Sequence, residues 1–422
     1  MNSFVQRLRG GMLLVLFLCS VPTTSLLSAD WPRFRGPTGD GISSDAKIPT
    51  QWGDKNNLNW KLKLPGKGFS SPIVVGDFVF VTCYTDAEGD LNNLKRHLLC
   101  VHRHQGNVVW SKVVRSTARE NRGPRFGTSH GFASHTPVSD GERVYVLFGN
   151  SGVLAFDMKG KELWKQDVGK ESASMFGSAA SPILYKDQLI VTASAESESI
   201  RALDKMTGKE VWKSEGASLS RNYSTPIISK NKTGKDELII SVPFEVWSLN
   251  LNNGKLNWYA ETKVDTNSCP SLITQDGIVY AVGGRGGGRA AIRMGGKGDV
   301  TKSNVLWSTN GGSYVPSPVL YKGHLFWVND SGIAICVDAK TGKEVAKKRI
   351  GGQFYASAVL IKDKIYAVSR FSGTYVLEAT PTLRQVAHNE LSDESDFSAS
   401  PAVSDGQLIL RSDAYLYCIE AK

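Results

Sequence analysis

The sequence lacks most of the features that assign an enzyme class at sight. It has no pair of adjacent cysteines, no zinc-ligand spacing and no Gly-x-x-x-x-Gly-Lys-Ser/Thr phosphate loop. After the N-terminal residues it has no long stretch of 3.6-residue periodicity, which excludes a helical or α/β fold. Lys and Arg are scattered without a long basic block, so we expect no nucleic-acid partner.

Long apolar runs are also missing, except for one near the N-terminus. Residues 12–21 are apolar and follow Arg7 and Arg9, and the run is too short to span a membrane. The pattern predicts a signal peptide over residues 1–29, cleaved after Ala29, and a periplasmic or secreted protein without a transmembrane span. We expect no lipid anchor, because Leu18 before Cys19 is bulky. The signal holds two Arg and no acid, so its removal lowers the formal charge from +10 to +8.

What the sequence does contain is repetition. "CVHRHQGNVVW" begins at Cys100, "AFDMKGKELW" at Ala155, "ALDKMTGKEVW" at Ala202 and "SLNLNNGKLNW" at Ser248, and "CVDAKTGKEVA" at Cys336 is a variant without the Trp. In each phrase Gly supplies a positive-φ turn between two short strands, and in all but the first, which has His102, an Asp or Asn caps the turn. A flat, large Trp at the end suits packing between neighbouring units. The predicted docking tryptophans are Trp60, Trp110, Trp164, Trp212, Trp258 and Trp307.

A second phrase has a small residue, then Pro, then an alternating apolar run. It occurs eight times, once with Ala358 in place of the Pro, and Pro137, Pro182, Pro226 and Pro270 are 45, 44 and 44 residues apart. This period, with four short strands in each unit, predicts an all-β protein: an eight-bladed β-propeller of four-stranded antiparallel blades.

The eighth unit ends at Lys422 without its fourth strand. Residues 58–64, with Trp60 in the docking position, supply that strand, so we expect the N-terminal strand to close the last blade and the ring. The predicted organisation is a signal peptide (1–29), an N-terminal extension (30–57) and a propeller (58–422). Blades six and seven carry Ala346 and Val386 where the Trp is expected.

Five cysteines remain after signal cleavage. Cys100, Cys336 and Cys418 occupy one repeat position, and Cys269 occupies a position held elsewhere by Ser or Thr. They resemble small buried residues of separate blades. Cys83 and Cys100, within one unit, are the one pair near enough to bridge, and the sequence leaves that question open.

The motif Ala-x-Asp-x-x-Thr-Gly-Lys-x-x-Trp at residues 202–212 resembles the docking repeat of quinoprotein-type propellers. This PQQ-repeat superfamily includes pyrroloquinoline quinone (PQQ) dehydrogenases and the outer-membrane assembly scaffold BamB. The resemblance covers nearly the whole mature chain and implies the eight-bladed fold, but a fold does not carry an activity. "DWPRFRGPTGDG" at residues 30–41 looks like the leader of secreted PQQ-repeat proteins.

The dehydrogenases of this superfamily have features of the quinone site that this chain lacks. The dehydrogenases hold the quinone under a disulfide of adjacent cysteines and ligate Ca²⁺ with carboxylates and an Asn, and they are longer. We therefore expect no cofactor and no metal. The expected function is a non-enzymatic, BamB-like binding or scaffold protein of the cell envelope, acting as a monomer on an envelope protein or an anionic ligand. The alternatives are a PQQ-type oxidoreductase and a polysaccharide-active enzyme that uses the channel face.

Loops joining blades meet at one face of a propeller, so candidate ligand-binding residues were sought there. The loop 115–136 is long and contains several Arg and His, which suit an anion or a lid. The segment 283–298 is rich in Gly and Arg, with a mobile basic hairpin as the plainer interpretation. An acid–base pair such as Glu245 or Asp396 with Arg221 or Arg370 suits catalysis or a structural ion pair equally. The ligand-binding candidates are Arg122, Arg125, His130, His135, Arg221, Tyr223, Glu245, Arg285, Arg289 and Arg370.

The same reasoning predicts which other residues surround the channel mouth. They come from different blades, and no catalytic residue can be assigned among them. They are Phe176, Asn267, Tyr314, Asp330, Tyr355, Asp396 and Asp413.

Overall fold

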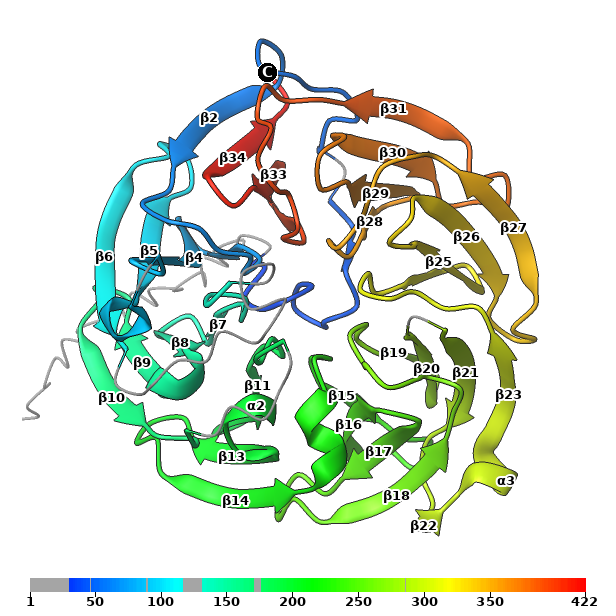
Figure 1. The fold of residues 1–422 in the computed structure, drawn as a ribbon. Helices are drawn as coiled ribbons and strands as arrows, with labels where there is room; N and C mark the ends of the chain where they lie inside the picture. The colour runs from blue at the N-terminus through cyan, green and yellow to red at the C-terminus, as the bar shows by residue number, and fades with distance from the viewer. Residues whose placement is uncertain (1–29, 46, 89, 117–130, 171–175, 285) are drawn as a thin grey trace, which may run out of the picture.

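Each predicted repeat forms a four-stranded antiparallel blade, and eight blades stand around a common axis (Figure 1). Two of the sheets gain a fifth, parallel strand at one edge. The computed structural model describes residues 30–422 except 46, 89, 117–130, 171–175 and 285. The predicted fold class is confirmed. In six blades the innermost strand follows a Ser/Thr-Pro pair, whereas Cys269-Pro270 stands there in blade five and Ser357-Ala358 in blade seven. In every blade the outermost strand carries the docking position.

The strands of the first four blades follow the chain without interruption. Blade one is β3 (Ile73–Val75), β4 (Phe78–Thr85), β5 (Lys95–His102) and β6 (Val108–Arg115); blade two is β7 (Val138–Ser139), β8 (Arg143–Leu147), β9 (Val153–Asp157) and β10 (Glu162–Gln166); blade three is β11 (Ile183–Tyr185), β12 (Gln188–Ala193), β13 (Ser199–Asp204) and β14 (Glu210–Glu215); blade four is β15 (Ile227–Lys230), β16 (Asp236–Val242), β17 (Glu245–Leu249) and β18 (Leu256–Glu261).

The remaining blades follow the same order, with the last completed from the N-terminus. Blade five is β19 (Ile273–Gln275), β20 (Ile278–Gly283), β21 (Gly288–Arg293) and β23 (Val305–Asn310); blade six is β24 (Val319–Tyr321), β25 (His324–Val328), β26 (Ile333–Asp338) and β27 (Glu344–Arg349); blade seven is β28 (Val359–Ile361), β29 (Lys364–Val368), β30 (Thr374–Glu378) and β31 (Gln385–Asn389); blade eight is β32 (Ala402–Ser404), β33 (Gln407–Arg411), β34 (Tyr415–Glu420) and β2 (Leu58–Lys63).

Short helices are confined to connections in the described part of the chain. They are η1 (Leu91–Asn93), η2 (Gly149–Ser151), α2 (Ser194–Ser197), η3 (Ala217–Arg221) and α3 (Thr301–Asn304). None of the described helices has the length and hydrophobicity needed to cross a membrane.

The Thr-Gly-Lys corner forms for a local reason that is visible at Asp204. Its Oδ1 accepts hydrogen bonds from the backbone N–H groups of Met206 and Thr207 and from the Thr207 hydroxyl, at 2.7–3.0 Å. The Thr207 hydroxyl is the largest cause of the lowered pKa of this carboxyl, so the cap is charged at neutral pH. Gly208 follows at φ +74°, a conformation that residues with a Cβ rarely adopt.

The tryptophans lock neighbouring blades through this corner. The Trp164 ring lies on Gly208 of the next blade, where an added Cβ would meet it at 2.6 Å, and its Nε1 donates to the Lys205 carbonyl at 3.0 Å. The other tryptophans that repeat this contact are Trp60 on Gly106, Trp110 on Gly160, Trp212 on Gly254 and Trp307 on Gly342.

Trp258 departs from this geometry because blade five lacks the Gly corner. The inserted residues place β22 (Gly298–Asp299) beside β18, pairing in parallel with Trp258 opposite Gly298. Trp258 is therefore fully buried, and its Nε1 donates to the carboxylate of the buried Glu237 at 2.8 Å.

The structure corrects one docking position. In blade six Ala346 lies opposite Cys336, the register that pairs Trp110 with Cys100, as predicted. In blade seven the equivalent residue is Ala387 opposite Val376, so the prediction of Val386 was wrong by one residue. The β-bulge just before this position is the same in these blades, and the docking residue lies four residues after the positive-φ residue of the turn. In blade seven that residue is Leu383 (φ 46°) instead of Gly, so the sequence carries no glycine from which to count.

The N-terminal extension fills the space left by this missing Trp. Trp52 is buried in the apolar cluster that also contacts Val386 and Ala387, and it stacks on Tyr366 with ring centroids 6.1 Å apart. Asn389 fixes it: the Asn389 Oδ1 accepts from the Trp52 backbone N–H at 2.9 Å. Blades seven and eight are thus joined by a residue from outside the repeats.

Closure of the ring by the N-terminal strand is confirmed. β2 pairs with β34, and Trp60 lies opposite Cys418 in the docking register. Trp60 Nε1 donates to the carbonyl of Arg103 in blade one at 2.6 Å. The buried Arg103 guanidinium returns to blade eight, donating to the Gln407 Oε1 at 2.8 Å and the Ser404 carbonyl at 2.8 Å.

The cysteine question is also resolved. Cys83 and Cys100 are both buried with free thiols, and none of the five cysteines forms a disulfide. Burial raises the pKa of the Cys83 thiol to about 11 and that of Cys100 to about 12, so both are unreactive packing residues.

Candidate functional site

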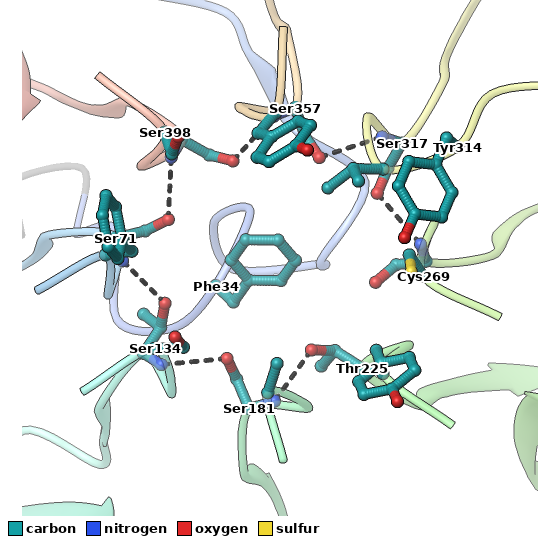
Figure 2. Close-up of a pocket in the computed structure, with 18 of the residues that line it drawn as sticks. Phe34, Ser71, Ser134, Ser181, Thr225, Cys269, Tyr314, Ser317, Ser357 and Ser398 are labelled. Atoms are coloured by element: carbon teal, nitrogen blue, oxygen red, sulfur yellow. Dashed lines mark hydrogen bonds between the residues drawn. The ribbon is translucent and has the colours of Figure 1, made fainter. Parts of the chain in front are cut away.

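A ring of hydroxyl groups lines the channel at the start of the innermost strands (Figure 2). In seven of the eight blades the backbone N–H of the residue two positions before the innermost strand donates to the hydroxyl of the equivalent residue in the next blade. Without that partner, an N–H facing the channel would be buried and unpaired. The bonds, at 2.9–3.0 Å, run from Ser71 to Thr136, Thr136 to Ser181, Ser181 to Thr225, Ser271 to Ser317, Ser317 to Ser357, Ser357 to Ser400 and Ser400 back to Ser71.

Blade five differs from the prediction at this ring. Alignment on proline placed Cys269 in the Ser/Thr position, but Ser271 occupies it and donates to Ser317. β19 begins at Ile273, two residues after Ser271, as the innermost strand of blade six begins two residues after Ser317. The proline therefore lies near the hydroxyl ring, but only the hydrogen bond between blades identifies the residue that belongs to the ring. Cys269 lies in the wall of the channel cavity as a half-buried residue.

The leader segment reaches into the channel, which the sequence did not predict. Figure 2 shows Phe34 inside the hydroxyl ring, and Phe34 lines the cavity. Trp31 pairs with Val74 by backbone hydrogen bonds of 2.9 Å, and β1 (Ile42–Ser43) lies parallel to β28. The chain between these anchors is thereby held across the axis.

Of the two arginines of the leader, Arg35 is buried and Arg33 is half-buried. Arg35 is 1% exposed, and its guanidinium donates to the carbonyl oxygens of Asp40, at 2.7 Å, and of Pro318 in blade six. Burial lowers the pKa of both Arg33 and Arg35 to about 10, and the Asp40 carboxylate opposes that shift. Both remain charged at neutral pH, and Arg35 ties the leader to the propeller through the Pro318 carbonyl.

The cavity above Phe34 is small and uncharged. Its volume is about 140 Å³, and its described lining contains no Asp, Glu, His, Lys or Arg. Aromatic side chains from different blades form the rim, and Phe176 meets Tyr223 edge-on with centroids 5.8 Å apart. Of the residues predicted at the mouth, the structure brings four to this wall: Phe176, Tyr223, Tyr314 and Tyr355.

His135 lies directly behind the cavity in a polar cluster. It is 6% exposed, its Nε2 is 3.0 Å from the Ser178 Oγ, and the Ser178 hydroxyl donates to the carboxylate of the buried Glu196. Burial, aided by the Arg96 guanidinium, lowers the pKa of His135 to about 3, so the imidazole is neutral. Because the Ser178 proton is directed to Glu196, the imidazole donates to the hydroxyl. His135 is therefore not placed as a base for Ser178.

Arg370 forms an ion pair at the same face. Its Nε donates to both carboxylate oxygens of Asp396 at 3.1 and 3.2 Å, and its Nη2 also contacts Asp396. The guanidinium carbon is 4.3 Å from the Tyr355 ring centroid and 5.0 Å from that of Phe371. The charge is thus compensated beside the channel rim.

The remaining candidates lie apart from the cavity. Arg221 is exposed at the end of η3, and the Glu245 carboxylate accepts from the Trp247 Nε1. Arg289 is buried in β21 and donates to the carbonyl oxygens of Gly342 in blade six and of Gly311. The segment predicted as a basic loop is thus mainly a strand. Arg122, Arg125, His130 and Arg285 lie outside the described residues.

No cluster of three or more His, Cys, Asp or Glu in the described part of the chain has the arrangement of a metal site. The candidate site is therefore the uncharged, aromatic-rimmed channel mouth.

A family model described as outer membrane protein assembly factor BamB matches residues 94–348, more than half of the chain. The chain belongs to this family. An uncharacterized protein of Rickettsia prowazekii (strain Madrid E) is 22% identical over 330 residues, 74% of this chain and 70% of that protein.

Solved structures of a BamB protein and of two dehydrogenases share this fold. BamB from Moraxella catarrhalis matches with a TM-score of 0.61 and 13% identity, over 86% of this chain and 99% of that chain. A europium-containing methanol dehydrogenase matches with 0.65 and 11%, over 90% and 89%. A quinohemoprotein alcohol dehydrogenase of Pseudomonas putida HK5 matches with 0.63 and 11%, over 93% and 81%. At these identities the matches show the fold alone.

Proposed function

We propose that this protein is a non-enzymatic, BamB-like binding protein of the cell envelope that uses the channel face. The observation that carries the proposal is the state of the channel: Phe34 stands in it, and its described lining is uncharged. The family's description as an outer-membrane assembly factor supports the envelope as its location.

The channel does not fit PQQ. A three-carboxylate quinone needs cations or a metal, and the described lining residues supply neither. The cavity of about 140 Å³ is also below the roughly 300–1,000 Å³ of ordinary ligand sites. We therefore propose that the protein works without this cofactor. Among the described residues, the lining also has no carboxylate pair of the kind that glycoside hydrolysis requires.

The face around the channel offers apolar contacts instead. Phe244, in the β16–β17 hairpin, is 51% exposed at φ 66°, and Phe371, in the β29–β30 loop, is 56% exposed. A positive φ is rare for an aromatic residue and is retained where the surroundings fix it. Hydrogen bonds of 2.7 Å from Phe244 to Val264 and from Thr262 to Phe244 hold this hairpin. Exposed rings on rigid hairpins are suitable anchors for a protein partner.

A titration of the purified protein with PQQ and Ca²⁺ tests the proposal. Quinone absorbance and tryptophan fluorescence report binding, and dye reduction over a panel of alcohols and sugars reports turnover. We expect neither, and a Phe34→Ala variant tests whether the plug is the reason. Stoichiometric binding with dye reduction by the wild-type protein contradicts the proposal and assigns an oxidoreductase.

A further inference from the structure

The channel cavity, which we call the aromatic cup, has Phe34 as its floor and is built by the same position in every blade (Figure 2). The residue two positions before the hydroxyl-ring residue lines it in all eight blades, because alternate residues of an extended chain point to the same side. Half of these residues are small, and the cup is the space that they leave. The small ones are Ser134, Ala179, Cys269 and Ser398.

The cup is unsuited to a charged ligand. Its described lining contains no Lys, Arg or His to meet an anion and no Asp or Glu to meet a cation. One ring of the wall already has a cation against it, since the Arg370 guanidinium carbon lies 4.3 Å from the Tyr355 ring centroid and the charge is paired with Asp396. A second cation beside Tyr355 would be repelled. The ligand that suits the cup is therefore neutral.

The size of the cup fits one six-membered ring. Its volume is about 140 Å³, and an apolar cavity of about 150 Å³ in another protein binds benzene. A dye of fused rings is larger and needs the space that Phe34 occupies. A whole peptide is larger still, so the occupant is a single side chain whose backbone stays outside the cup.

The walls favour an aromatic ring over an aliphatic group of the same size. Aromatic rings prefer edge-to-face or offset contacts with one another. Phe176 and Tyr223 already make such a contact at the rim, with centroids 5.8 Å apart and an interplanar angle of 79°. Phe34 comes from outside the repeats and stands inside the hydroxyl ring, so the chain itself places an aromatic side chain in this channel. A phenyl group also has no polar atom that would need a partner there.

We propose that the aromatic cup receives the side chain of one phenylalanine from the protein partner. The phenyl ring packs on Phe34 and against the aromatic rim. The exposed Phe371 ring, 5.0 Å from the Arg370 guanidinium carbon, extends the apolar contact from the cup to the surface. The inference rests on the proposed function, in which this face binds an envelope protein, and it names the residue type that the face recognises.

Calorimetric titration of the full mature protein with Nα-acetyl-phenylalanine methylamide tests the cup. The cyclohexylalanine analogue has a saturated ring and controls for aromatic contacts, and tetramethylammonium tests a cation site. We expect saturable binding of the phenylalanine compound, binding of the cyclohexylalanine compound weaker by roughly two- to tenfold, and none of tetramethylammonium. Equal binding of both ring compounds overturns the aromatic part of the proposal. Binding of tetramethylammonium, or no saturable binding of the phenylalanine compound in the millimolar range, overturns the whole.

A substitution that fills the cup locates the binding. Ala179→Phe should fold, because Phe69, Tyr223 and Tyr355 stand at the equivalent position of other blades, and it should abolish binding of the phenylalanine compound. Ala217→Phe, at an exposed position of η3 outside the cup lining, is the matched control and should change nothing. Ser398→Phe, at the equivalent position of blade eight, repeats the test if Ala179→Phe does not fold. Undiminished binding by a folded cup-filling variant contradicts the proposal.

Photocrosslinking from Phe244 in cells separates this inference from the proposed function. We expect the cup-filling variant to lose the partner adduct that the wild-type protein forms. If the variant keeps that adduct at full yield, the cup is not the recognition site, although the face still binds a partner. If the wild-type protein binds the phenylalanine compound but forms no adduct, the proposed function fails while the ring site remains.

Discussion

Replacing Trp60 with Ala tests how the ring is closed. The Trp60 side chain is 9% exposed, packs on Gly106 and donates to the Arg103 carbonyl. Truncating a buried Trp to Ala costs about 3–5 kcal/mol in the free energy of unfolding. Because native proteins are stable by only about 5–15 kcal/mol, this variant should be close to the limit of folding.

Smaller changes at the same strand separate the contributions. Trp60→Phe keeps most of the apolar contact and loses the hydrogen bond, so we expect a loss of about 1–2 kcal/mol. Lys63→Ala, exposed on the same strand, should stay within about 0.5 kcal/mol of the wild type. Guanidinium unfolding followed by circular dichroism measures all three. If Trp60→Ala unfolds like the Lys63 variant, β2 does not close the ring as described.

Three further predictions concern the repeats, pH and the plug. Gly208→Ala should lower the melting temperature more than Gly234→Ala, since both have positive φ but only at Gly208 would the Cβ meet a ring, that of Trp164. His135 binds a proton below pH about 6.5 in the unfolded chain, but only below pH about 3 in the folded protein. The free energy of unfolding should therefore fall as the pH decreases between these values, and His135→Gln should flatten that part of the stability–pH profile. A variant with the wild-type profile refutes the assignment. Phe34→Ala should admit small apolar dyes to the channel, detected by their fluorescence, and equal dye binding by the wild-type protein contradicts the plug.

The repeats made the architecture predictable. Pro and Trp recur at positions that have the same structural role in successive blades. The sequence alone therefore predicted the eight blades, the closure by the N-terminal strand and five of the six tryptophan contacts between blades. Trp258 could not, because its contact depends on the inserted β22, which has no counterpart in the other blades. Ala387 was missed by one residue because Leu383 takes the place of the turn glycine in blade seven. Ser271 was missed by two because the proline of blade five precedes the ring residue, whereas in the other proline-containing blades it follows.

The candidate site was predicted only in part. Tyr223 and the other aromatic rim residues follow from their place before the innermost strands, which the repeat fixes. The repeat pattern did not predict the position of the leader, which lies outside the repeats. Arginine is a typical surface residue, and only tertiary contacts bury Arg35 and half-bury Arg33. The available sign in the sequence was the three glycines close to these arginines, Gly36, Gly39 and Gly41. All three have positive φ in the structure, where the leader turns tightly.

The central claim, that the channel face binds a partner in the envelope, is tested most directly by site-specific photocrosslinking in intact cells. A benzophenone amino acid is placed at Phe244 on this face, and at Leu163, which is 41% exposed on the outer strand β10, as the control. We expect one discrete protein adduct from Phe244 and none from Leu163. Adducts of equal yield at both positions, or none at Phe244, contradict the claim.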